Sequence, residues 1–299
     1  MKKILITGGN GFVGKNFIKY LRKKKKNHII PIPRSIDLRS NSKVNKYFKN
    51  IGKASYIFHF AEVSGNKEWS KKNSFKQTLM NLKININVIS AWKKYQPEAK
   101  FIFLSSIWSY PIGNSYLLEK DYWKGEINKE LLHFAYNKRI ATILLETAKR
   151  NLNLKATTLI LGTVYGPGDL SDHFIPTIIR RMRNEKNYLR VYGTGKESRD
   201  FIYVDDQVKG IYMSKDYNGE ILNIGTGKLT TIKKIIQISK KLIRYKGKIE
   251  YMKFNKSPDK NRGMSIKNAK KFIGWSKKNK FVNIEKGLKN TIQDMLENE

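Results

Sequence analysis

Short apolar runs and amphipathic stretches alternate along most of the chain. Ile4 to Ile6 is an apolar run rich in β-branched residues, and an amphipathic pattern follows from about Phe12 to Lys24. Short runs predict buried strands, whereas apolar positions three and four apart predict helices. By the same pattern we expect further strands over 28–33, 56–61, 101–105, 156–161 and 221–227, and further helices over 81–91, 134–151, 173–184, 231–243 and 284–296. The alternation predicts an α/β fold with a doubly wound parallel sheet.

A glycine-rich turn, Thr7-Gly-Gly-Asn-Gly-Phe-Val-Gly14, joins the first strand to the first helix. Gly8 would allow the tight turn, Gly11 the approach of backbone to a pyrophosphate, and Gly14 close packing of helix on sheet. A helix N-terminus also attracts anions. Glycine turns can be purely structural, but this position favours a dinucleotide site. The residues expected to bind the cofactor here are Gly8, Asn10, Gly11, Phe12, Val13 and Gly14.

The end of the second predicted strand bears on which dinucleotide fits. An acidic residue there would bind the ribose 2′-hydroxyl of NAD, whereas an arginine would pair with the 2′-phosphate of NADP. Arg34 and Ser35 stand at this place, so NADP is favoured and NAD is the alternative. Asp37 and Leu38 are expected to line the adenine side. The plain alternative for Arg34 is a solvated surface arginine.

Two further strand ends carry candidate residues. Ala61 ends the strand over 56–61, and Ser105 and Ser106 end the strand over 101–105. Ligands of open α/β sheets bind at the carboxyl edge of the strands. Asn81, on the helix over 81–91, is a further candidate for the cofactor side.

Composition narrows the class of protein. Hydrophobic residues make up 40% of the 299, which predicts a globular chain, and cysteine is absent, which fits a reducing cytoplasm. No apolar run approaches the roughly 20 residues that cross a bilayer. The first strand begins near residue 3, which leaves no room for a signal peptide. We therefore expect a soluble, cytoplasmic protein without membrane partners.

The formal net charge is +36. Nucleic-acid binding is one interpretation of such a charge. However, 48 of the 60 basic residues are lysines scattered along the whole chain, whereas readers of bases and phosphates cluster arginine. We expect no nucleic-acid partner. Asp205 and Asp206 are more consistent with capping the following helix than with metal binding, and no metal site is expected.

Several motifs in order resemble one family, the extended short-chain dehydrogenase/reductases that modify nucleotide sugars. The motifs are Thr7 to Gly14, His59-Phe-Ala61, Ser105-Ser106 with Tyr110, Tyr165-Gly-Pro167, Arg199-Asp-Phe-Ile-Tyr-Val-Asp-Asp206 and Asn223-Ile-Gly225. Within the family, the segments Ser109-Tyr-Pro111, His173 to Arg181 and Tyr192-Gly-Thr-Gly195 are most similar to GDP-fucose synthase-like 4-keto reductases. The resemblance covers nearly the whole chain and implies a Rossmann-like cofactor domain.

In this family a tyrosine gives a proton to the sugar ketone, a lysine lowers the pKa of that tyrosine and holds the ribose, and a serine binds the carbonyl oxygen. Ser106 matches the serine and Lys138 the lysine. The tyrosine should lie four residues before the lysine, on the same helical face. That position is Phe134, which cannot donate a proton.

Three interpretations of Phe134 stay open. It could be an engineered Tyr→Phe change that leaves the packing intact. It could be a natural change, with Tyr136, His133 or water supplying the proton. Tyr136 lies two positions further along the helix and so points away from the Phe134 direction. The third interpretation is a chain that binds cofactor and nucleotide without turnover.

Two other departures narrow the reaction that the resemblance implies. Dehydratase relatives carry acidic residues just after the serine pair, but Ile107 and Trp108 stand there, so dehydration is not expected. GDP-fucose synthase uses a cysteine and a histidine for double epimerisation. Trp108 occupies the cysteine position and His173 matches the histidine. An indole cannot abstract a proton from carbon, so we expect reduction without that epimerisation, with His173 on the substrate side.

The resemblance implies that Arg181, Arg199 and Arg262 hold the nucleotide diphosphate. A guanidinium suits this role because it can bind phosphate with two parallel hydrogen bonds. The plain alternative for each is a surface or salt-bridged arginine. The residues expected on the substrate side are Ser106, Trp108, Thr163, Arg181, Tyr192, Arg199 and Arg262. The cofactor side is completed by Arg34, Asp37, Leu38, Ala61, Asn81, Ser105 and Lys138.

The function favoured by the sequence is NADP(H)-dependent 4-keto reduction of a nucleotide-linked deoxy sugar, with GDP as the expected carrier, for surface polysaccharide. The alternatives are an NAD-dependent 4-epimerase and a non-catalytic dinucleotide-binding module. The dinucleotide domain is expected over 1–162 plus about 200–227, and a smaller substrate domain over about 163–199 plus 228–299. The resemblance also implies a homodimer that pairs through helices over 81–95 and 134–151.

Overall fold

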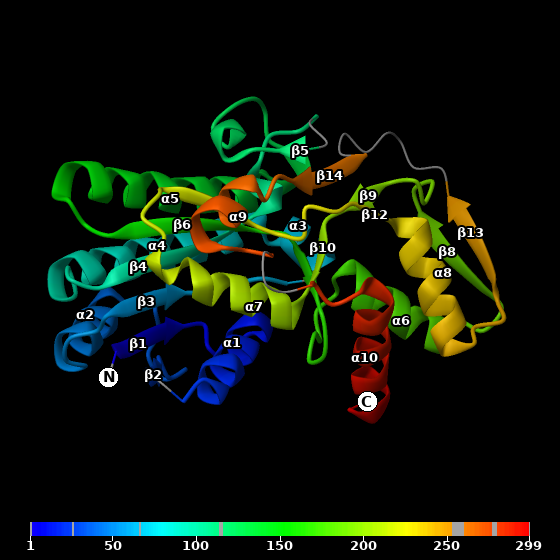
Figure 1. Cartoon of the computed structure of the whole chain (residues 1–299), viewed down its shortest axis with the longest axis horizontal. Coiled ribbons are helices and arrows are strands. Elements are labelled where there is room, and N and C mark those ends of the chain that lie inside the picture. The colour runs from blue at the N-terminus through cyan, green and yellow to red at the C-terminus, as the bar shows by residue number, and fades with distance from the viewer. Residues whose placement is uncertain are drawn as a thin grey trace. The chain divides into compact units, whose positions relative to one another are not determined.

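The structure is a computed structural model that describes residues 2–25, 27–65, 67–113, 116–252, 260–276 and 280–298. The chain divides into two compact units, whose helices and strands are labelled in Figure 1. Unit 1 comprises residues 1–109, 129–160 and 208–222, and unit 2 comprises residues 110–128, 161–207 and 223–299.

Unit 1 is built on a parallel sheet. Its strands are β1 (Lys2–Thr7), β2 (Asn27–Pro31), β3 (Tyr56–His59), β4 (Lys100–Ser106), β6 (Ala156–Leu161) and β11 (Ile221–Ile224). In the described residues they form a six-stranded sheet in the order β11-β6-β4-β3-β1-β2. The chain runs from β1 to β2 on one side and then to β3 on the other side of β1. This reversal creates a crevice at the carboxyl ends of β1 and β3, where open α/β sheets bind ligands.

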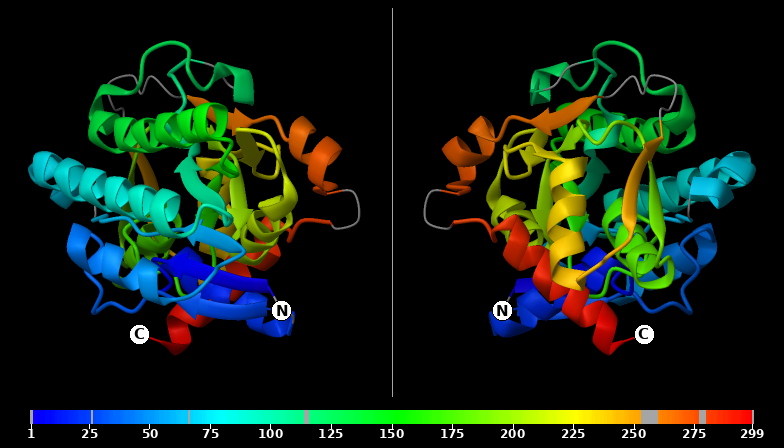
Figure 2. Two further views of the ribbon diagram at one scale, coloured as in Figure 1. Left: turned by 90° about the vertical axis from the view of Figure 1, so that its left-hand side faces the viewer. Right: turned by 90° about the vertical axis from the view of Figure 1, so that its right-hand side faces the viewer.

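Helices cover both faces of this sheet. They are α1 (Phe12–Lys23), α2 (Asn41–Asn50), α4 (Ser74–Tyr95), α5 (Leu132–Leu152) and α7 (Val204–Met213), and the short α3 (Lys67–Lys72) contacts α4. The helices α2, α4 and α5 pack on one face of the sheet (Figure 2, left), in a core that includes the fully buried Trp92. On the other face, Phe17 of α1 packs against Phe58 of β3. The layers bury nearly continuous apolar strands, as parallel sheets require.

Unit 2 contains smaller sheets. Its strands are β5 (Tyr116–Leu117), β7 (Thr163–Tyr165), β8 (Tyr188–Tyr192), β9 (Ser198–Arg199), β10 (Phe201–Tyr203), β12 (Thr230–Thr231), β13 (Lys248–Met252) and β14 (Asn261–Met264). Its helices are α6 (Phe174–Asn184), α8 (Ile232–Ile243), α9 (Lys267–Ile273) and α10 (Ile284–Glu297). β8 and β13 pair in parallel (Figure 2, right). Apolar side chains of α6 and α8 pack against this pair.

The predicted α/β fold with a doubly wound parallel sheet is confirmed, but several boundaries differ. β2 ends at Pro31 instead of residue 33, and α4 begins at Ser74, well before the expected residue 81. Residues 110–128, 161–162, 200–207 and 223–227, expected in the dinucleotide domain, lie in unit 2. The segment from Tyr110 is held there by hydrogen bonds: the Tyr110 hydroxyl donates to Asn223 Oδ1 at 2.8 Å, and Arg262 donates to the Tyr110 carbonyl at 2.7 Å.

No helix in the described part of the chain is both long enough and apolar enough to span a bilayer.

Candidate functional site

The glycine turn has the geometry of a phosphate cradle. Gly8 has a φ of +65°, and a Cβ there would lie 2.5 Å from the Ala61 nitrogen, so only glycine fits. A Cβ on Gly14 would lie 2.3 Å from the Gly8 oxygen. The Gly11 nitrogen closes the turn on the Gly8 oxygen at 3.0 Å. Gly11 caps α1 without a side-chain hydrogen bond, so the first backbone N–H groups of α1 can bind an anion. These residues fit the diphosphate of a dinucleotide.

The strands on either side of the crevice are tied together by side chains. Thr7 Oγ1 lies 2.6 Å from His59 Nδ1 and accepts a hydrogen bond from the Ala61 nitrogen at 3.1 Å. His59 Nε2 lies 3.0 Å from Asn85 Oδ1. His59 is fully buried, and this burial lowers its pKa to about 4. The imidazole is therefore neutral at physiological pH, and its two ring nitrogens connect Thr7 to Asn85 through hydrogen bonds.

Asn81 lies beneath the loop that follows β3. Its Oδ1 accepts from the Val63 nitrogen at 2.7 Å, and its Nδ2 donates to the Val63 oxygen at 3.0 Å. Gln77 Nε2 donates to the same oxygen at 3.1 Å. Asn81, expected to contact the cofactor, is buried and bonded to the protein's own backbone. It fixes the loop from Ala61 to Val63 at the crevice.

Lys138 lies at the carboxyl end of β4. Its Nζ donates to the Leu104 oxygen at 2.9 Å and lies 2.9 Å from Glu62 Oε2. The ammonium also lies 5.7 Å from the centre of the Phe134 ring. The structure thus brings Lys138 and Phe134 together on one face of α5, as the spacing predicts. Glu62, for which the sequence carried no signal, forms an ion pair with this lysine.

The serines sit on the strand that Lys138 contacts. Ser105 is buried, and its Oγ lies 3.4 Å from Ser109 Oγ. Ser106, at the end of β4, is only partly buried and accepts a hydrogen bond from the Trp108 nitrogen at 3.2 Å. The Ser106 hydroxyl remains able to donate to a ligand oxygen. Trp108 lies in a single helical turn, Ile107–Ser109, directly after it.

The other proposed proton donors differ in exposure. Tyr136 is 48% exposed, on the outer side of α5, while Phe134 is partly buried. His133 is partly buried, which lowers its pKa. Tyr136 thus lies on a different face of the helix from Lys138, as helix geometry predicts.

Of the residues after β2, Arg34 is exposed to solvent, whereas Asp37 and Leu38 are bonded within the protein. Asp37 binds Arg39 at 2.8 Å, and this hydrogen-bonded pairing lowers the pKa of Asp37 to about 2. The Leu38 oxygen accepts from Asn87 Nδ2 at 3.0 Å, which ties the segment to α4. Arg34 is therefore the residue of this segment that can turn to an anionic ligand.

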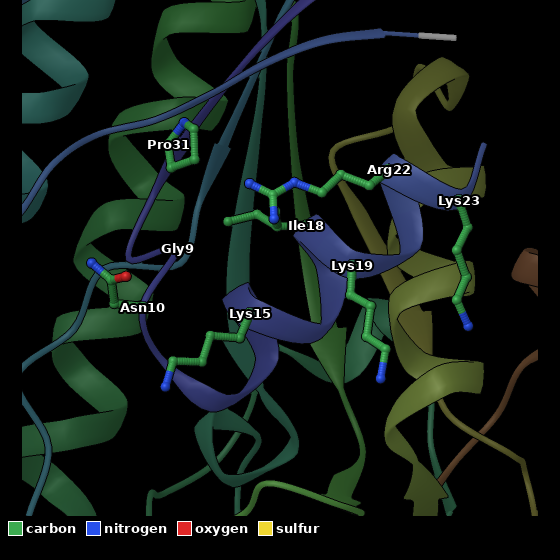
Figure 3. A pocket seen from close by; sticks show the side chains of 8 residues that line it. All are labelled: Gly9, Asn10, Lys15, Ile18, Lys19, Arg22, Lys23 and Pro31. Carbon is green, nitrogen blue, oxygen red and sulfur yellow. The ribbon is translucent and has the colours of Figure 1, made fainter. Parts of the chain in front are cut away.

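A basic pocket opens beside the glycine turn, and we name it the α1 pocket. It has a volume of about 600 Å³ and is lined by Gly9, Asn10, Lys15, Ile18, Lys19, Arg22, Lys23 and Pro31. Figure 3 shows the Arg22 side chain extending past Ile18 toward Pro31, and Lys15 and Lys19 on the same helix. Four of these lining residues are cationic and none is acidic. Such a pocket favours a phosphate-bearing ligand.

Unit 2 carries the residues expected on the substrate side. His173 is exposed at the start of α6, with its Nδ1 3.8 Å from Asp169 Oδ2. Arg181 binds Glu185 at 2.6 Å and the Arg190 oxygen at 2.7 Å. Tyr192 is 75% exposed at the end of β8. The Arg181 guanidinium is thus already paired within the protein.

Arg199 and Arg262 lie opposite one another on the adjacent strands β9 and β14. Arg199 donates to the Ser198 and Lys260 oxygens at 2.8 and 3.0 Å. Arg262 is only 1% exposed and donates to the Tyr110 and Pro111 oxygens. Thr163 Oγ1, on β7, is buried with no hydrogen-bond partner in the described part of the chain. Arg262 therefore anchors backbone, whereas Thr163 presents an unsatisfied hydroxyl.

Within the described residues, no group of three or more His, Asp or Glu side chains could hold a metal ion.

The fold and the glycine cradle define a nucleotide-binding α/β protein, and comparison with known proteins gives its family. The NAD dependent epimerase/dehydratase family matches residues 4–225, and the chain belongs to that family. It is similar to GDP-L-colitose synthase of Yersinia pseudotuberculosis, at 28% identity over 98% of both chains. It is also similar to UDP-glucuronate 4-epimerase of Thermodesulfobacterium geofontis, at 31% identity over 82% of this chain and 73% of the relative.

Among solved structures, a GDP-mannoheptose C4 reductase from Campylobacter jejuni with NADP bound aligns with a TM-score of 0.87. The alignment covers 99% of this chain and 98% of that one, at 23% identity, and so shows the shared fold. The resemblance to nucleotide-sugar-modifying enzymes is confirmed, and a nicotinamide dinucleotide is the cofactor that this family uses.

Proposed function

We propose that the protein uses NADPH to reduce the 4-keto group of a GDP-linked deoxy sugar in the synthesis of surface polysaccharide. The observation that carries this proposal is the position of Lys138 at the carboxyl end of β4, where its ammonium donates to the oxygen of Leu104, the residue directly before Ser105 and Ser106. Support comes from the similarity over nearly its full length to a GDP-L-colitose synthase.

Each residue has a defined task in this proposal. The Ser106 hydroxyl donates to the ketone oxygen. Lys138 binds the ribose through its third N–H, because the other two bond to Leu104 and Glu62. The backbone at Gly11 and Phe12 binds the diphosphate. When bound, the dinucleotide supplies the hydride. The Phe134 ring only packs beside the ammonium, so we expect slow turnover.

The preference for NADP rests on charge. Arg34 follows β2 with its side chain exposed, and the α1 pocket adds four cations beside the glycine turn. An additional 2′-phosphate would be favoured in this surrounding, whereas an acidic residue that would select the NAD ribose is not found at the end of β2.

On the substrate side, the nucleotide diphosphate is assigned to Arg181 and Arg199, with Tyr192, Thr163, Trp108 and His173 as further contacts. Thr163 offers an unsatisfied buried hydroxyl. Arg181 would have to exchange its bond to Glu185 for a phosphate. Arg262 acts through the backbone of residues 110 and 111 that it binds.

The test is NADPH oxidation with a GDP-4-keto-6-deoxyhexose by the native chain and by Phe134→Tyr. Supplying a positioned general acid typically accelerates a reaction by about 10²- to 10⁴-fold, and we expect a gain in this range. Tyr136→Phe is the matched control, because it removes a hydroxyl from the outer side of α5 and should leave the rate unchanged. Fast turnover by the native chain would mean that another group donates the proton. No turnover by either chain would rule out this substrate.

Two alternative functions remain testable. The 31% identity to a UDP-glucuronate 4-epimerase favours an NAD-dependent epimerase as the second candidate. An epimerase would retain its dinucleotide through purification and need no added reductant. The third candidate, a binding module without turnover, is favoured only by Phe134. It would bind NADPH but stay inactive after Phe134→Tyr.

We also propose that two copies pair through α4 and α5. Exposed apolar side chains follow both helices, which are neighbours on one face of the sheet. They are Phe75, Leu79 and Ile86 on α4 and Leu132, Tyr136, Ile140, Ile143 and Leu144 on α5. Exposed apolar side chains that recur along two neighbouring helices favour burial against a partner. A second copy would present the same helices, which gives a symmetric four-helix contact.

A further inference from the structure

Glu62 and Lys138 form an ion pair that is largely shielded from water. Glu62 Oε2 lies 2.9 Å from Lys138 Nζ, and the two side chains are only 21% and 11% exposed. A charge removed this far from water is costly unless it is paired. The Phe103 and Phe134 rings, 5.2 and 5.7 Å from the ammonium, give it apolar surroundings. Glu62 is the carboxylate that balances the lysine.

The backbone on both sides of Glu62 is fixed. The Ala61 nitrogen donates to Thr7 Oγ1 at 3.1 Å, and the Val63 nitrogen and oxygen both bond to Asn81. Glu62 is thus held between two anchored residues, and its carboxylate has little freedom to leave the ammonium. A surface ion pair lacks such anchoring, because two flexible side chains must be ordered to form it.

The ammonium of Lys138 has three N–H donors. Leu104 accepts one and Glu62 a second, which leaves the third in a set direction. A hydroxyl at position 134 would be another oxygen on the same helical face that could hold the ammonium. Position 134 carries phenylalanine, and the oxygen partner comes instead from Glu62 on a different segment of the chain.

We propose that Glu62 is the positioning residue for Lys138: its carboxylate fixes the ammonium in place of a tyrosine hydroxyl at position 134, so that the third N–H faces the dinucleotide. This inference rests on the proposed function for the ligand, but the pairing itself is a property of the protein alone. Removing Glu62 should loosen Lys138, and a hydroxyl at position 134 should restrain it again.

The first measurement needs no ligand. The protein is acetylated briefly with a dilute amine-reactive acetylating reagent. Peptide mass spectrometry then gives the extent of labelling of Lys138 relative to that of Lys100. Lys100 is the internal control, since it is also buried and donates to the Tyr217 oxygen. We expect several-fold more labelling of Lys138 in Glu62→Ala and an intermediate value in Glu62→Gln, which keeps an oxygen acceptor. Glu68→Ala, an exposed glutamate paired with Lys72, should match the native chain.

The second measurement is the affinity for NADPH, followed by fluorescence titration. The loss of a hydrogen bond to a charged group predicts affinity weaker by about tenfold in Glu62→Ala. The double variant Phe134→Tyr with Glu62→Ala should return both the affinity and the labelling toward the native values. A carboxylate that served only the fold would not be replaced by a hydroxyl on another element. Thermal unfolding confirms that each variant is folded.

Unchanged Lys138 labelling in both Glu62 variants would overturn the inference. A loss in Glu62→Ala that Phe134→Tyr does not restore would also overturn it, because Glu62 would then not stand in for a hydroxyl. If no chain binds NADPH, the proposed function fails, and the labelling pattern decides the role of Glu62 by itself.

Discussion

Thr7 and His59 end two neighbouring strands and are bonded side chain to side chain, with Thr7 Oγ1 2.6 Å from His59 Nδ1. The register of β1 and β3 places them opposite each other. Because Thr7 also binds the Ala61 nitrogen, this contact fixes the start of the loop that carries Glu62. The buried imidazole stays neutral, since burial lowers its pKa to about 4.

This burial makes stability depend on pH. The unfolded chain binds a proton at His59 below about pH 6.5, whereas the folded protein does so only near pH 4. The stability from the neutral histidine is therefore complete above pH 6.5 and is lost as the pH falls toward 4. At about 1.4 kcal/mol per pH unit, the native protein should lose about 2 kcal/mol between pH 6.5 and 5 through this group.

Urea unfolding at several pH values measures this loss, and His59→Gln should show about 2 kcal/mol less of it. His133→Gln is the control, because His133 is only partly buried. Its lowered pKa gives an effect of the same sign but smaller size. Equal pH dependence in the native chain and His59→Gln would contradict the assignment of the effect to His59.

The sequence predicts those features that depend on local periodicity. The parallel strands and main helices of unit 1 follow from apolar runs and helical spacing, and Lys138 and Phe134 share a helical face because four residues separate them. The helix α2 was not predicted, although Val44 and Phe48 have core spacing, because polar residues dominate that segment. β8 alternates buried and exposed positions, but it is short and pairs with a segment some 60 residues away.

Contacts between distant segments could not be read from the sequence. Glu62 follows a recognisable motif, His59-Phe-Ala61, but only the fold brings it to Lys138. Arg262 matches a family position that holds phosphate, and in the structure its guanidinium is buried against backbone carbonyls. Asn81 similarly binds backbone in the structure. Side-chain chemistry alone does not separate a ligand contact from an internal one.

Asn81→Ala should loosen the loop after β3. Two bonds between the Asn81 amide and the Val63 backbone would be lost in a buried place, which costs about 1–3 kcal/mol. We expect this loss in urea unfolding together with weaker NADPH binding. The control Asn45→Ala removes only a bond to the exposed Asn41 side chain and should change neither quantity. A drop in stability with unaltered NADPH affinity would show that the loop does not position the ligand.

Arg34→Ala should separate the two dinucleotides. A charge-assisted bond to the 2′-phosphate is worth about 1.5–3 kcal/mol, so the Kd for NADP should rise by about tenfold or more while that for NAD stays constant. Arg39→Ala is matched to it in charge and position, but the Arg39 guanidinium already binds Asp37 at 2.8 Å. Equal weakening for NADP and NAD would point to general steering by charge instead of recognition of the 2′-phosphate.

The exposed apolar side of α5 predicts that two copies of the protein pair through this helix. Leu132, Tyr136, Ile140 and Leu144 recur every four residues and are 37–48% exposed, so they form one stripe along the helix. In a symmetric pair of α4 and α5, this stripe would lie against its own copy. The double variant Ile140→Glu with Leu144→Glu would place four carboxylates in that contact and should yield monomers in light scattering, with NADPH binding retained. Lys289→Glu, at an exposed position of α10, is the control for a charge change away from these helices and from the α1 pocket. A native chain that is monomeric at micromolar concentration would exclude this interface, because the exposed stripe would then have no copy to bury it.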